Sequence, residues 1–241
     1  MIEKPISTIT GKITLKIPST LQELTLGQLM AMQEKPELND LDAISILSGT
    51  PTQELQNIKN ADDLHVFGEA VLSLANQLKY LYNSDEIPEH VIFHHTTKPL
   101  KIKVMHNLSV EPAGAFLASK DIIATEINEH ISKHGEENWQ ESFNPSLNAC
   151  CKVLANYFYC KVTKDRYDEY KIEEFCETIK QLRVTEALPI AKHFFICYPS
   201  LYKRRPGFWH RLLPFWKKKQ AYKTLSGLNT STPLTPSQAA I

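Results

Sequence analysis

Residues 60–82, NADDLHVFGEAVLSLANQLKYLY, show most clearly which kind of fold this chain adopts. Their apolar residues recur at intervals of three and four, at Leu64, Phe67, Val71, Leu74, Leu78 and Leu81. Because an α-helix turns once in 3.6 residues, this spacing places them on one face. Asp62 and Asp63 complement the positive end of a helix dipole at its N-terminus. The stretch predicts a long helix with one buried face, which other elements of the fold must cover.

Helical patterns with their own start and stop signals precede this stretch. Thr25 and Gln28 fit a capping box, in which each side chain bonds the backbone of the other, and they predict a helix over residues 26–35. Asn39 or Asp40 caps a second helix that runs through Leu47 and stops at Gly49. A third short helix, ending near residue 57, has Thr50 as its cap and Pro51 in its first turn.

Further helical patterns fill the second half of the chain. We expect a long helix over residues 110–133, with Ser109 as its cap and Gly135 closing it. The remaining predicted helices cover residues 144–161, 167–183, 185–198 and 208–225, the last weakened by Pro214.

Strand patterns are few. Residues 12–17 alternate between polar and apolar side chains, which is the period of a strand. Residues 91–95 and 100–104 predict a hairpin around a short polar turn, and either strand is a candidate partner for residues 12–17. The fold class is therefore mostly α with a small antiparallel β element (α+β), a multi-helix bundle-like body and a disordered C-terminal tail. We divide it into an N-terminal α+β region (1–108), a helical region (109–200), a basic aromatic arm (201–225) and the tail (226–241).

The charge of the chain is distributed unevenly. The whole chain has 27 basic and 27 acidic residues, but residues 201–241 hold eight of the bases and none of the acids. The first 200 residues therefore have a net charge of −8. An acidic body with a basic arm favours partners that carry phosphate, anionic lipid or an acidic protein surface, or an arm that folds back on its own body.

Two of the three tryptophans lie among the cations of this arm. The predicted partner-binding residues are Arg204, Arg205, Phe208, Trp209, Arg211, Phe215, Trp216, Lys217, Lys218 and Lys219. Aromatic and arginine side chains are typical of protein interfaces. The same composition also suits insertion at an anionic membrane surface or stacking on single-stranded nucleic acid. We rank a protein partner first and keep the other two as alternatives.

Residues 13–28, ITLKIPSTLQELTLGQ, followed by ISILSG at 44–49, resemble the start of tail-assembly chaperones and related morphogenesis proteins of tailed bacteriophages. The resemblance covers about the first 60 residues, and no individual binding residue can be transferred through it. It implies non-catalytic binding of a long helical tape-measure protein during tail assembly. On this basis we expect a phage structural or assembly protein, and a nucleic-acid-associated virion protein or a peripheral membrane protein is the alternative.

Residues with catalytic or metal-binding chemistry have structural explanations that we favour. Glu126, His130 and His134 lie four residues apart on one helix and could bind zinc, but a solvated helix face is the preferred interpretation. The adjacent His94 and His95 would point to opposite faces of a strand. The acids at 165, 168, 169, 173 and 174 suit a helix N-terminus. We expect no enzyme activity, no metal site and no cofactor.

The five cysteines, at positions 150, 151, 160, 176 and 197, form no CxxC pair and are interpreted as reduced thiols, most of them in the core. The sequence has neither a signal-peptide pattern nor an apolar run of about 18 residues that would span a membrane. We therefore expect a protein of the host cytoplasm, with the virion as a second location.

Overall fold

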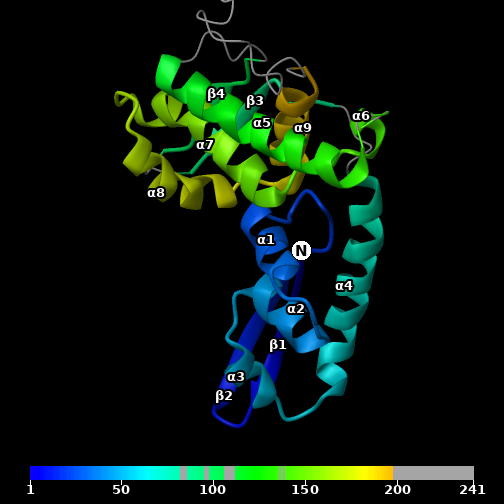
Figure 1. The fold of residues 1–241 in the computed structure, drawn as a ribbon. Coiled ribbons are helices and arrows are strands. Elements are labelled where there is room, and N and C mark those ends of the chain that lie inside the picture. The colour runs from blue at the N-terminus through cyan, green and yellow to red at the C-terminus, as the bar shows by residue number, and fades with distance from the viewer. Residues whose placement is uncertain (82–85, 95–97, 106–111, 136, 138, 198–241) are drawn as a thin grey trace, which may run out of the picture. The chain divides into compact units, whose positions relative to one another are not determined.

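A β-hairpin opens the chain. β1 (Ile2–Thr8) pairs antiparallel with β2 (Gly11–Ile17), and Figure 1 shows the two strands running side by side. Side chains alternate between the two faces of a strand, and Ile6, Leu15 and Ile17 are buried in the core. The prediction of a strand at 12–17 is confirmed, whereas β1 was not predicted.

The prediction that residues 12–17 pair with a later strand was wrong. Their partner is β1, reached through a two-residue turn, and β3 (His90–Phe93) pairs with β4 (Leu100–Lys103) in a sheet of its own. Bringing adjacent segments together costs less chain entropy than closing a loop of more than seventy residues. The hairpin of β3 and β4 was predicted and is confirmed, with shorter strands than expected.

Among the described residues, four helices follow the first hairpin and precede β3. They are α1 (Leu26–Gln33), α2 (Asp40–Ser48), α3 (Thr52–Gln56) and α4 (Asp62–Leu81). The capping box of α1, the Asn39 cap of α2 and its left-handed end at Gly49, with a φ of 70°, are as predicted. In α4, Phe67 and Leu74 are buried, so the predicted apolar face is confirmed there.

The C-terminal part of the described chain contains α5 (Ala113–His134), α6 (Trp139–Ser142), α7 (Leu147–Thr163), α8 (Glu169–Lys180) and α9 (Val184–Cys197). Most side chains of α7 are buried, because it packs against α5, α8 and α9 and also against α1 and β4. A helix that is apolar on nearly every side has to lie in the middle of its neighbours.

Several predicted helix starts were displaced. The cap of α3 is Pro51 rather than Thr50, and no side chain bonds the backbone there. Pro112, whose ψ of 141° is extended, delays α5 to Ala113, while Ser109 lies outside the described residues. α7 starts after Ser146, whose hydroxyl accepts from Ala149 N at 3.2 Å. α6 was not predicted, because a single turn has too few residues to show a periodicity.

An aromatic cluster in the core joins the second hairpin to the helices. The ring of Phe93 in β3 lies 5.1 Å from that of Phe158 in α7 and 6.4 Å from that of Phe175 in α8. The hydroxyl of Tyr157 both accepts from the backbone N–H and donates to the carbonyl of Met105, just beyond β4. Burial of such side chains stabilises the fold by about 1.5–3 kcal/mol each.

Backbone hydrogen bonds join the beginning of the chain to the connection between α8 and α9. Leu26 N donates to Leu182 O at 2.8 Å, and Val184 N donates to Leu24 O at 2.9 Å. Gly27 lies against this region, since a β-carbon there would be 3.0 Å from Lys180 Cβ. The N-terminal and C-terminal helices are therefore held together by main-chain bonds as well as by the core.

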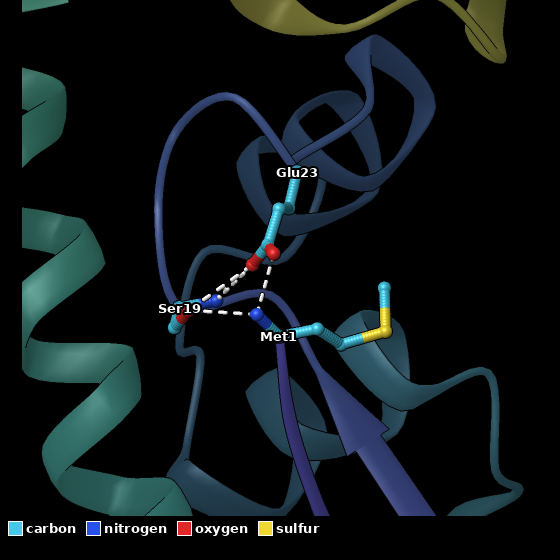
Figure 2. A network of polar contacts seen from close by, with 3 residues as sticks. All are labelled: Met1, Ser19 and Glu23. Carbon is cyan, nitrogen blue, oxygen red and sulfur yellow. Dashed lines mark hydrogen bonds and ion pairs between the residues drawn. The ribbon is translucent and has the colours of Figure 1, made fainter.

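The N-terminal amine is part of a polar network on the connector before α1 (Figure 2). It donates to Glu23 Oε1 at 2.5 Å and to Ser19 Oγ at 2.9 Å. The other oxygen of Glu23 accepts from the backbone N–H and the hydroxyl of Ser19 at 2.9 and 3.1 Å. The ammonium and these donors lower the pKa of Glu23 from 4.5 to about 2.

This computed structural model describes residues 1–81, 86–94, 98–105, 112–135, 137 and 139–197. They belong to one compact unit, and residues 203–241 lie outside the description. The predicted fold class, mostly α with a small antiparallel β element, is confirmed. The predicted helix at 208–225 and the predicted tail at 226–241 are outside the described residues.

Candidate functional site

An apolar groove lies on the surface between α1, α2 and α4. It has a volume of about 330 Å³, and its lining includes Leu29, Met32, Leu38, Leu47, Val71 and Leu74. Leu147, the first residue of α7, also contributes to it. Gln33 is the one polar residue among those that line it. We call this surface the apolar groove.

Local hydrogen bonds fix the two helices that form one side of the groove. The amide of Gln28 accepts from Thr25 N at 3.0 Å within the capping box of α1, and its Nε2 donates to Leu47 O of α2 at 2.9 Å. A single side chain therefore starts α1 and binds it to the last turn of α2. This bond sets the position of Leu29 relative to Leu47 across the groove.

The groove has a buried floor and a more accessible rim. Leu47, Leu74 and Leu147 are buried, whereas Leu38 is 39% exposed and Met32 is half-buried. Met32 is unbranched and can adapt its shape to different partners. A concave apolar surface of this kind can accept the apolar residues of an amphipathic helix.

All ten predicted partner-binding residues of the basic arm lie outside the described residues. They are Arg204, Arg205, Phe208, Trp209, Arg211, Phe215, Trp216, Lys217, Lys218 and Lys219. The structure therefore neither brings them together nor separates them, and their role stays a prediction.

Glu126 and His130 have structural partners near the start of α7. Glu126 accepts from Ser146 N at 3.0 Å and from Ser146 Oγ at 2.7 Å. His130 Nε2 lies 3.1 Å from Ser142 Oγ, and its ring is 4.6 Å from that of His134. Burial first, and then the charges of His134 and Lys133, lower the pKa of His130. The part of the chain that the structure describes contains no group of three His, Cys, Asp or Glu residues arranged to bind a metal.

The acidic residues around α8 include its helix cap. Asp168 is the N-cap and accepts from Tyr170 N at 3.1 Å, and Glu169 lies in the first turn. This agrees with the interpretation of a helix terminus matched to its dipole. His94 is exposed, and His95 lies outside the described residues.

Within the described ranges, no helix combines the length and the apolar character that a membrane span needs.

Sequence reasoning missed the apolar groove. Its lining comes from four helices, α1, α2, α4 and α7, and from the loop that holds Leu38, so no single periodic pattern shows it. The one local signal is Leu38 itself, an apolar residue within the polar stretch KPELND at 35–40. An apolar side chain in a polar loop indicates either a core contact or a binding surface.

Comparison of the chain with protein-family models, with curated proteins and with solved structures gives no match.

Proposed function

We propose that this chain is a non-catalytic phage structural or assembly protein that binds an amphipathic helix of a partner protein in the apolar groove. The observation that carries the proposal is the groove itself, an apolar surface between α1, α2 and α4 with Leu38 and Met32 at its rim. Helices bind in such grooves through apolar residues at intervals of three and four.

The resemblance to tail-assembly chaperones supports this choice of partner. The segments that carry it, residues 13–28 and 44–49, include the start of α1 and the end of α2. These helices form two walls of the groove, and Gln28, the last residue of the first segment, joins them. A tape-measure protein is a long helix and offers apolar faces of the kind required. We propose the host cytoplasm as the place of action, with the virion as a second location.

A direct test uses a fluorescent amphipathic helical peptide with leucines at helical spacing and the full-length chain. Leu38→Glu places a carboxylate on the rim of the groove, and we expect it to weaken binding about tenfold or more, measured by fluorescence anisotropy. Leu72→Glu is the matched control, because Leu72 is 65% exposed and does not line the groove. Equal binding by both variants would contradict the groove as the site.

The phage context is tested separately. We expect the full-length chain to co-purify with a long helical protein encoded by a neighbouring reading frame, and Leu38→Glu to reduce the recovery. Peptide binding without such a partner would leave the groove as a helix-binding site and reject the role in tail assembly.

The basic arm supports a second candidate function, binding of single-stranded nucleic acid. It combines eight basic residues with two tryptophans and has no acidic residue. Phosphate contacts release counterions, so we expect binding of a labelled oligonucleotide to weaken steeply as salt rises. Binding of anionic vesicles but not of the oligonucleotide would favour the membrane alternative instead.

A further inference from the structure

Two cysteines on neighbouring helices are in contact with each other. Cys151 lies in the second turn of α7, and Cys176 lies in α8, which packs directly on α7. The thiol of Cys151 donates a hydrogen bond to the main-chain O of Cys176, with 3.7 Å between Sγ and O. Both are free thiols, and 25 residues of sequence separate them.

Only one member of the pair is accessible. Cys151 is 1% exposed, whereas Cys176 is half-buried and lines an open groove of about 540 Å³ between α5, α7 and α8. The groove also contains Lys152 and the exposed Tyr170. This volume can accommodate a tripeptide-sized molecule next to Cys176, whereas Cys151 does not line the groove.

The surroundings favour the thiolate at Cys176. The neighbouring thiol of Cys151 is the main cause that lowers the pKa of Cys176, and the positive charges of Lys152 and Lys180 act in the same direction. The pKa of Cys151 is raised, first by its interaction with the Cys176 thiol and then by burial. The accessible sulfur is therefore the nucleophile, and its neighbour keeps a proton until the first reaction has occurred.

The other described cysteines differ from this pair. Cys150 is 1% exposed, and burial raises its pKa, so it is unreactive in the folded protein. Cys160 is half-buried like Cys176, at the other end of α7, and serves as a control of similar accessibility.

We propose that Cys176 and Cys151 form a reactive thiol pair that exchanges with small disulfides of the glutathione type. The Cys176 thiolate attacks one sulfur of the disulfide, whose S–S bond breaks, and one thiolate leaves and takes a proton from water. Cys151 then attacks Cys176 Sγ as a thiolate, the mixed disulfide breaks, and the proton that Cys151 gives up passes to the departing sulfur, which leaves as the second thiol. The two protein thiols are oxidised to one bridge between α7 and α8, and the small disulfide is reduced to two thiols. This site is independent of the apolar groove.

The test incubates the full-length chain with oxidised glutathione, blocks the remaining thiols with N-ethylmaleimide and identifies tryptic peptides by mass spectrometry. The expected product joins the peptide of residues 134–152 to that of residues 172–180. Because the first peptide contains both Cys150 and Cys151, serine variants are needed to show which of the two is linked to Cys176. We expect the link to persist in Cys150→Ser and to be lost in Cys151→Ser, where glutathione stays attached to Cys176.

Two further results are decisive. N-ethylmaleimide added alone in brief pulses should label Cys176 faster than Cys160, and equal labelling would contradict the assigned nucleophile. The proposed pair would be wrong if the link formed through Cys150. It would also be wrong if glutathione stayed on Cys176 in the unmutated chain without forming a bridge. Circular dichroism of each serine variant shows whether a lost link reflects lost chemistry or a lost fold.

Discussion

The hydroxyl of Tyr167 donates a hydrogen bond to Oδ1 of Asn156 across 3.1 Å. Asn156 lies in α7 and is 3% exposed, and its Nδ2 donates to Lys152 O at 2.9 Å. Burial is the first cause that raises the pKa of Tyr167, so the hydroxyl keeps its proton and remains a donor at neutral pH. Its ring lies against Gly114, the second residue of α5. One side chain from the connection between α7 and α8 therefore contacts both α7 and α5.

Removing this hydroxyl should destabilise the protein. Tyr167→Phe leaves the buried Oδ1 of Asn156 without its donor, and we expect the free energy of unfolding to fall by about 1–2 kcal/mol. Urea unfolding followed by circular dichroism measures the change. Tyr170→Phe is the control, because Tyr170 is 89% exposed and should change the stability by less than about 0.5 kcal/mol. Equal effects of the two substitutions would contradict the role of the hydrogen bond.

Replacement of glycine by alanine should have opposite effects on stability at two helical positions, Gly114 and Gly68. A β-carbon at Gly114 would be 2.5 Å from Cδ1 of Tyr167, so Gly114→Ala has to displace the ring and should cost about 1–3 kcal/mol. Gly68 in α4 has open space at that position, and Gly68→Ala should stabilise the protein by about 0.5–1 kcal/mol. Thermal unfolding of both variants shows whether each substitution raises or lowers the melting temperature. A stabilising Gly114→Ala would show that the ring of Tyr167 can move aside without cost.

The hydroxyl groups of Ser119 and Ser146 should contribute differently to the stability of the protein. Ser119 of α5 is 1% exposed, and its Oγ has no hydrogen-bond partner among the described residues. Because the hydroxyl loses its water without gaining a partner, Ser119→Ala should leave stability unchanged or raise it by about 1 kcal/mol. Ser146→Ala removes the cap of α7 and should cost about 1 kcal/mol. Urea unfolding compares them, and a destabilising Ser119→Ala would mean that its hydroxyl has a partner in the protein.

Features set by neighbouring residues could be predicted from the sequence. The capping box of Thr25 and Gln28 and the cap at Asn39 use side chains that reach only two or three residues along the chain. The helical spacing around Phe67 and Leu74 needs no tertiary information either. These local rules predicted the fold class and most helices, because backbone hydrogen bonds within a helix connect residues four apart.

Features set by distant residues could not be predicted. Leu38 lines the apolar groove only because α4 lies across from the loop, and Cys176 lies beside Cys151 only because α8 packs on α7. Neither contact has a period or a spacing in the sequence. Glu126 was interpreted as part of a solvated face, yet it bonds to the cap of α7 twenty residues later. Both proposed sites are therefore built from contacts between helices, which a single sequence does not encode as a pattern.

The pair of Glu23 and the terminal ammonium of Met1 should make stability depend on acid pH. The pKa of Glu23 is about 2 in the folded chain against 4.5 in the unfolded chain, so its carboxylate stabilises the fold above pH 4.5. This contribution shrinks as the pH falls from 4.5 toward 2, because the unfolded chain takes up the proton first. Since solvent screens the site, we expect the Glu23 carboxylate to contribute about 1 kcal/mol to the free energy of unfolding at neutral pH.

Glu23→Gln measures this contribution directly. The variant should be less stable than the unmutated chain at pH 7, and the difference in free energy of unfolding should narrow at pH 3, measured by urea unfolding at both values. Glu3→Gln is the control, because Glu3 forms a well-exposed ion pair with Lys16 at 3.1 Å and such pairs contribute little. A difference for Glu23→Gln that stays constant between pH 7 and pH 3 would mean that lost packing, rather than the carboxylate charge, explains the effect.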